Sequence, residues 1–302
     1  MNLSRRKAVG VGTAAFAAPL NFVKGADRMK HIKAYGDGPY GQMHYRIVSP
    51  PAASRVPLVC LHITPISGVV YENLMEAMGA DRIVVAPDTP GYGGSAPPPA
   101  PVGIPEFARA MVGLMDQLNL KHVDLMGYHT GDFIATELAR TIPDRVRKVV
   151  MISAPLFTTE ELDTYRKLWY GDAKSHGETP PTFAEAVTEM ARVRGNGNMG
   201  FWRGVPTEER FGEIMTEWMR SYRREHWGHE AVFAYDLAKY LPEVKQPILV
   251  LRPQDDLWEH TLRARPHMKN GRFHDLPGYT HGFLDSHTEE IAGLLRAFLD
   301  RG

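Results

Sequence analysis

The pentapeptide Gly127-Tyr128-His129-Thr130-Gly131 constrains the fold of this chain more than any other segment. Residues 121–126 before it form a short, mostly apolar run of strand length, and apolar residues recur at helical spacing in residues 133–138 after it. In a tight strand-to-helix turn, small flanking residues let strand, turn and helix approach closely, and the two glycines meet this need. The segment therefore predicts a nucleophile elbow with histidine at its centre, where serine, cysteine or aspartate is usual.

Strand and helix signals alternate along much of the remaining chain. The sequence predicts a strand pair within residues 31–48 around the turn Gly36-Asp37-Gly38-Pro39, buried strands at 56–62, 83–86, 146–152 and 248–251, and helices at 104–118, 131–140 and 289–299. Unbroken apolar runs are typical of strands that are buried on both faces. The pattern therefore predicts an α/β fold with a mostly parallel sheet and helices on both faces.

Residues 156–241 differ in composition from the segments around them. Strand signals disappear there, and charged helix formers and tryptophans take their place. This predicts a helical cap inserted into a core of residues 27–155 and 242–302. We expect the cap to close over the elbow and to form a largely apolar pocket, for which the candidate residues are Tyr128, Trp169, Trp202, Trp227 and Phe283.

The N-terminus resembles an export signal. Ser4-Arg5-Arg6-Lys7 precedes an uncharged, weakly apolar stretch, residues 8–20, as in twin-arginine signals. We therefore expect residues 1–26 to direct the protein to the periplasm or outside the cell; the alternative is a cytoplasmic protein with an irregular start. No other segment approaches the roughly 20 apolar residues that span a bilayer, so we expect no integral membrane span in the mature chain.

Composition narrows the class of partner. Lys plus Arg and Asp plus Glu each number 35 among 302 residues, so no net charge favours nucleic acid, and we expect a small-molecule substrate. Cys60, the single cysteine, lies in an apolar run and is predicted to be a core residue. We expect no cofactor, because glycine-rich nucleotide motifs are missing, and no metal, because His226 and His229 lack a suitably spaced acidic or cysteine partner. Composition does not fix the oligomeric state.

Four motifs follow one another in a familiar order: Leu61-His62-Ile63-Thr64-Pro65, the turn in residues 87–95, the elbow, and a pair of loops at 249–256 and 277–281. Over residues 31–302 the chain resembles the alpha/beta-hydrolase superfamily, and most closely its capped haloalkane dehalogenases and epoxide hydrolases. The resemblance implies that Asp256 is the catalytic acid, with Asp255 beside it, and that His281 is the base. It implies oxyanion-hole amides at Thr64 and Thr130, and structural roles for His62 and Asp88.

Histidine at the elbow leaves the reaction open. A neutral imidazole needs no deprotonation before it attacks a carbonyl, so His129 suits hydrolysis of a small ester, lactone or related compound, with water activated by His281 cleaving the acyl-imidazole. Two histidines facing one pocket also suit acid–base chemistry in a lyase or isomerase. A ligand-binding protein without turnover is the third class. Thr130 should point into its helix and Ser153 should begin the cap, so neither is favoured as a nucleophile.

Overall fold

A computed structural model describes residues 29–170, 182, 184–185, 187–188 and 204–301 of the chain, with the side chains of residues 168–170 left undescribed. The expected export segment and Trp202 therefore lie outside the described residues. Eight strands form one sheet in the order β1-β2-β4-β3-β5-β6-β7-β8. Their bounds are β1 Ile32–Gly38, β2 Gly41–Val48, β3 Leu58–Leu61, β4 Val84–Pro87, β5 Val123–Tyr128, β6 Val146–Ile152, β7 Ile248–Pro253 and β8 Gly271–Leu276.

The sheet is mostly parallel, as the alternating sequence pattern predicts. β1 and β2 form an antiparallel hairpin, and β2 runs antiparallel to β4. All pairings from β4 onward through β8 are parallel. Each of β3, β4, β5 and β7 is buried at every position, which explains why these strands appear in the sequence as unbroken apolar runs.

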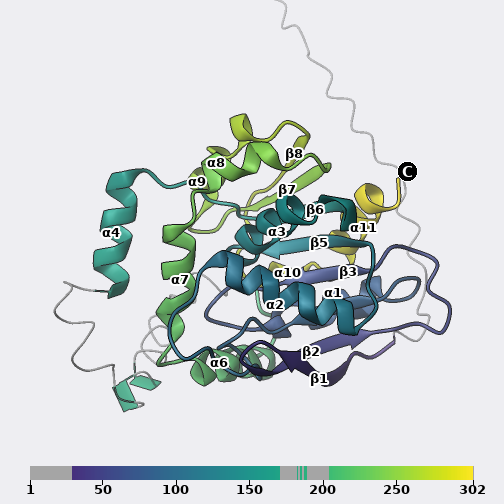
Figure 1. Ribbon diagram of the computed structural model, residues 1–302, viewed down its shortest axis with the longest axis horizontal. Helices are drawn as coiled ribbons and strands as arrows, with labels where there is room; N and C mark the ends of the chain where they lie inside the picture. Colours follow the sequence, from purple (N-terminus) through teal and green to yellow (C-terminus); the bar gives the residue numbers. More distant parts are fainter. Residues whose placement is uncertain (1–28, 171–181, 183, 186, 189–203, 302) are drawn as a thin grey trace, which may run out of the picture.

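Helices cover both faces of the sheet (Figure 1). One apolar layer includes side chains of α2 (Ile104–Gln117) and α3 (Thr130–Thr141), and the other includes side chains of α1 (Glu72–Met78), α10 (Phe283–Ser286) and α11 (Thr288–Leu299). α9 (Trp258–Leu262) follows β7. Short 3-10 segments are η1 Gly68–Tyr71, η2 Pro143–Arg145, η3 Leu241–Glu243 and η4 Arg265–His267. This arrangement is the alpha/beta-hydrolase fold.

Further helices are inserted between β6 and β7. They are α4 (Thr159–Tyr170), α6 (Glu208–Arg220), α7 (Glu225–Ala234) and α8 (Leu237–Tyr240), and in Figure 1 α4 and α7 lie to the left of the sheet and α6 below it. The described part of residues 156–241 contains no strand. Arg210 of α6 fastens the insertion to the core, because its Nη1 donates to Glu72 at 2.7 Å and its Nη2 donates to the Val69 carbonyl at 2.6 Å.

Within the described segments, no helix is both long and apolar enough to cross a bilayer.

His62 and Asp88 have the structural roles that the resemblance implies. The fully buried His62 ring accepts a hydrogen bond from the Thr89 amide at Nε2 (2.8 Å) and donates one from Nδ1 to the Ile63 carbonyl (2.8 Å). Burial lowers the pKa of His62, which keeps the ring neutral. The buried Asp88 carboxylate accepts hydrogen bonds from His44, Arg46 and the amides of Gly68 and Gly94. Together they fix the loops after β3 and β4.

Candidate active site

The elbow is a strained turn between β5 and α3. His129 has φ 48° and ψ −107°, a conformation that side-chain-bearing residues rarely adopt. Both flanking glycines are required: a Cβ on Gly131 would lie 1.9 Å from the Leu61 carbonyl oxygen, and one on Gly127 would lie 2.5 Å from the Asp132 amide nitrogen. The close approach of strand, turn and helix therefore holds the His129 imidazole at the end of β5.

Three loops bring four side chains together at one edge of the sheet. His129 follows β5, Asp255 and Asp256 follow β7, and His281 follows β8, so all four lie where parallel strands end. The ring centroids of the two histidines are 5.0 Å apart, and one potential ligand atom from each of the four residues lies within 4.8 Å of the others. We call these residues the four-residue cluster. The three predicted catalytic residues are thus brought together, with Asp255 added.

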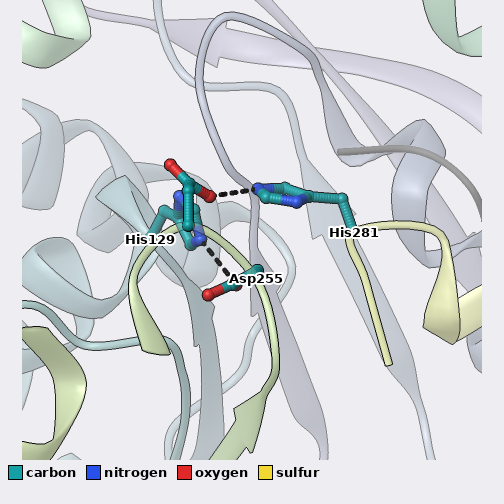
Figure 2. Close-up of side chains that lie close together, drawn as sticks. His129, Asp255 and His281 are labelled. Carbon is teal, nitrogen blue, oxygen red and sulfur yellow. Dashed lines mark hydrogen bonds and ion pairs between the residues drawn. The ribbon is translucent and has the colours of Figure 1, made fainter. Parts of the chain in front are cut away.

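Each histidine of the cluster faces its own carboxylate. His129 Nε2 lies 3.3 Å from Asp255 Oδ2 (Figure 2). His281 Nε2 lies 3.4 Å from Asp256 Oδ1. In a serine–histidine–aspartate triad the acid binds Nδ1 of the histidine and leaves Nε2 for the nucleophile. Here Asp256 pairs with the expected histidine but through Nε2, so the arrangement is two imidazole–carboxylate pairs rather than that triad.

Asp255, which the sequence indicates only as a neighbour of the acid, is the more firmly held of the two carboxylates. Its side chain is fully buried, whereas that of Asp256 is 43% exposed. The Ser153 hydroxyl donates to Asp255 Oδ2 at 2.5 Å, and the Leu257 amide donates to Oδ1 at 2.9 Å. Burial acts to raise the pKa of Asp255, but the His129 hydrogen bond and the nearby imidazoles outweigh it and hold the pKa below its ordinary value.

Ser153 is therefore a positioning residue. It directly follows β6 with φ 57°, and it lies buried behind Asp255 rather than beginning a cap helix.

Two fully buried aromatic residues support the histidines. The Tyr128 ring lies 5.0 Å from that of His129 and 6.0 Å from that of His281, and its hydroxyl donates to the His281 carbonyl at 3.3 Å. Phe283 packs edge-on against Tyr128 at 6.3 Å. Of the tryptophans expected at the pocket, Trp227 lies partly buried on α7, and Trp169 lies on α4 with a side chain outside the description. Tyr128 thus packs against both imidazoles from within the core, and Phe283 packs against Tyr128.

The two residues expected to supply oxyanion-hole amides lie side by side. The hydroxyls of Thr64 and Thr130 are 2.7 Å apart, and both residues are buried. Gly228 of α7 packs so closely on Thr64 that a Cβ there would lie 2.5 Å from the threonine hydroxyl. The loop after β3, the start of α3 and the insertion therefore meet next to His129.

His229 lies on α7, and the sequence indicated no role for it at the site. Burial lowers the pKa of His229 to about 4. A hydrogen bond with the Glu225 backbone acts against this shift, and the charges of His129 and His226 add to it. The side chain thus lies within electrostatic reach of His129, and it is neutral at pH 7. Its only sequence signal is the spacing of three from His226, which is as common in helices that pack without any site.

Replacing His229 with glutamine should reduce the loss of stability at acid pH. Between pH 6.5 and about 4 the unfolded chain binds a proton at His229 and the folded chain does not, so the free energy of unfolding decreases as pH falls through this window. The full shift corresponds to at most about 3 kcal/mol. Urea unfolding of wild type and His229→Gln at pH 7.5 and pH 4.5 measures the difference. Equal decreases in both proteins would contradict a His229 side chain that stays neutral in the folded protein.

Comparisons with known proteins agree with this fold. A family model described as alpha/beta hydrolase fold matches residues 56–189. A poly(3-hydroxyalkanoate) depolymerase of Ectopseudomonas oleovorans is 24% identical over 80% of this chain and 86% of its own length. A 2-hydroxy-6-oxo-6-phenylhexa-2,4-dienoate hydrolase of Burkholderia cepacia is 24% identical over 77% of this chain and 82% of its own length.

Solved structures share the fold. An enol-lactonase from Burkholderia xenovorans superimposes with a TM-score of 0.67 at 20% identity, over 89% of this chain and 100% of the lactonase. A haloalkane dehalogenase from Agrobacterium tumefaciens gives a TM-score of 0.70 at 19% identity, over 90% and 97% of the two chains. With the parallel sheet, these likenesses show that the chain is an enzyme with the alpha/beta-hydrolase fold.

Proposed function

We propose that the protein hydrolyses a small, largely apolar ester, lactone or related carbonyl compound at the four-residue cluster. The observation that carries this proposal is the pair of imidazole–carboxylate contacts at the elbow, 3.3 and 3.4 Å long, with the two rings 5.0 Å apart. The similarity to a poly(3-hydroxyalkanoate) depolymerase and to a 2-hydroxy-6-oxo-6-phenylhexa-2,4-dienoate hydrolase, and the fold shared with an enol-lactonase, support the substrate class. The helices between β6 and β7 would act as the cap over this substrate.

The geometry favours attack by water over attack by His129. Because Asp255 is ionised and faces His129 Nε2, that nitrogen carries a proton and is not available as a nucleophile. In the proposed reaction a water oxygen bonds to the carbonyl carbon and the water proton passes to the His281–Asp256 pair. The bond to the alcohol oxygen then breaks, and that oxygen takes up the proton. Amides of Thr64 and Thr130 would stabilise the intermediate oxyanion.

Direct attack by His129 is the second route for the same reaction. It is supported by the strained backbone at φ 48°, which aims the imidazole from the position of the usual nucleophile. This route differs in one observable: it passes through an acyl group bonded to His129.

Activity and adduct measurements on one substrate series test the proposal. We expect the wild type to hydrolyse activated aryl esters and small lactones, and we expect rapid-quench mass spectrometry to find no acyl adduct on the peptide containing His129. The exposed-histidine variant His122→Ala serves as the control and should retain full activity. An adduct on His129 would establish direct attack. If the wild type is inactive and His129→Ser turns substrate over, the site is a dormant scaffold and the proposal fails.

A further inference from the structure

We propose that the four-residue cluster binds one divalent transition-metal ion of the zinc class. Imidazole nitrogen and carboxylate oxygen are the ligands such ions take in proteins, and the cluster offers two of each. One potential ligand atom from each of His129, Asp255, Asp256 and His281 lies within 4.8 Å of the other three. This inference goes beyond the proposed function, since it concerns what the site holds rather than which bond it cleaves.

Two distances within the cluster also fit a metal polyhedron. The contacts between Nε2 and carboxylate oxygen measure 3.3 Å for His129–Asp255 and 3.4 Å for His281–Asp256. Charge-assisted hydrogen bonds are usually about 2.7–2.9 Å long. With bonds of about 2.0–2.1 Å, two ligands on a tetrahedral zinc ion lie about 3.3–3.4 Å apart. Both contacts have the length of one edge of the tetrahedron that the ligand atoms would form.

Burial divides the ligands into a fixed set and a solvent-facing one. The side chains of His129, Asp255 and His281 are at most 14% exposed, whereas that of Asp256 is 43% exposed. Ser153 and the Leu257 amide orient Asp255, as outer hydrogen bonds commonly do for ligands in metal sites. Three fixed ligands and one accessible position are typical of catalytic zinc sites, where water occupies the open position. The Asp256 side is therefore the side on which water would join the ion.

A metal ion would also account for histidine at the elbow. Water bound to such an ion becomes acidic enough to supply hydroxide near neutral pH, so no side-chain nucleophile is needed. His129 would then release its Nε2 proton on metal binding and act as a ligand that the elbow places under the substrate carbonyl. This catalytic consequence rests on the proposed function, whereas metal binding itself does not.

Metal binding to the full chain tests the inference. Chelator-treated protein is titrated with ZnCl2 by calorimetry and with CoCl2 by visible absorption, which reports the coordination geometry. We expect one ion per chain and Co²⁺ bands of a four- or five-coordinate site. His281→Ala and Asp255→Asn should each weaken Zn²⁺ binding by at least about 100-fold, and Ser153→Ala by about 10–100-fold. The matched control His122→Ala removes an exposed histidine outside the cluster and should bind as the wild type does.

The possible results separate this inference from the proposed function. Binding no tighter in the wild type than in His281→Ala, or Co²⁺ bands that match hexaaquo cobalt, would overturn the metal site even if the protein hydrolyses esters. Tight binding of one ion without turnover of any ester would leave the metal site standing and remove the proposed reaction. Should a variant fail to fold, as judged by circular dichroism, the Co²⁺ spectrum of the wild type decides alone.

Discussion

Replacing His129 with glycine is expected to lower kcat/KM for ester hydrolysis by about 10²–10⁴-fold while making the protein more stable than His129→Ala. The loss of activity follows because both variants remove the imidazole that faces Asp255. The difference in stability follows from the backbone: at φ 48° and ψ −107° a residue with a Cβ is strained by about 1–3 kcal/mol, and glycine relieves that strain. Glycine normally costs stability relative to alanine, so the expected order is the reverse of the usual one.

Urea unfolding and steady-state kinetics of the two variants measure both effects. The comparison of glycine with alanine removes the contribution of the lost imidazole contacts, because neither variant makes them. If His129→Gly is no more stable than His129→Ala, the elbow does not hold residue 129 in a strained conformation. If either variant keeps wild-type kcat/KM, His129 takes no part in the reaction.

Local signals in the sequence were sufficient to predict the elbow and most of the sheet. Every position of β3, β4, β5 and β7 is buried. A completely buried strand is a continuous apolar run, which can be recognised in a single sequence. β8 gives no such run, since it is the edge strand and five of its six residues are exposed or partly exposed. Only its pairing with β7 makes it a strand, and pairing between distant segments is not visible in local sequence.

The candidate site was predictable in its positions but not in its pairings. The order of motifs places an acid and a histidine after the last strands, but Asp255 and Asp256 are adjacent and nothing local says which one a given histidine faces. The structure turns Asp255 toward His129 and Asp256 toward His281. Ser153 escaped detection for a similar reason: its hydroxyl reaches Asp255 across 102 residues of sequence.

The same separation along the chain explains why the sequence pattern predicts no metal site. Recognisable metal motifs place ligands a few residues apart on one turn or helix, as with His226 and His229. In the four-residue cluster His129 and Asp255 are 126 residues apart, and only the parallel sheet brings their loops to one edge. The lack of closely spaced ligands therefore argues only against a metal site that one local segment supplies.

Replacing Gly131 with alanine is expected to destabilise the protein by at least about 3 kcal/mol and to reduce activity together with stability. The added Cβ would lie 1.9 Å from the Leu61 carbonyl oxygen and 2.6 Å from its carbon. Both are backbone atoms, so no side-chain rotation relieves the clash, and α3 must move away from β3. That movement would displace Thr130 and His129, which begin the same helix.

Gly293→Ala is the matched control for this prediction, because Gly293 also lies in a helix, α11, but has open space where the Cβ would go. There alanine should raise the free energy of unfolding by about 0.5–1 kcal/mol, the ordinary preference for alanine in helices. Urea unfolding of both variants gives the comparison, and the two changes are expected to have opposite signs. A Gly131→Ala protein as stable as Gly293→Ala would mean that β3 and α3 do not approach closely at the elbow, and the placement of His129 over the sheet edge would lose its physical cause.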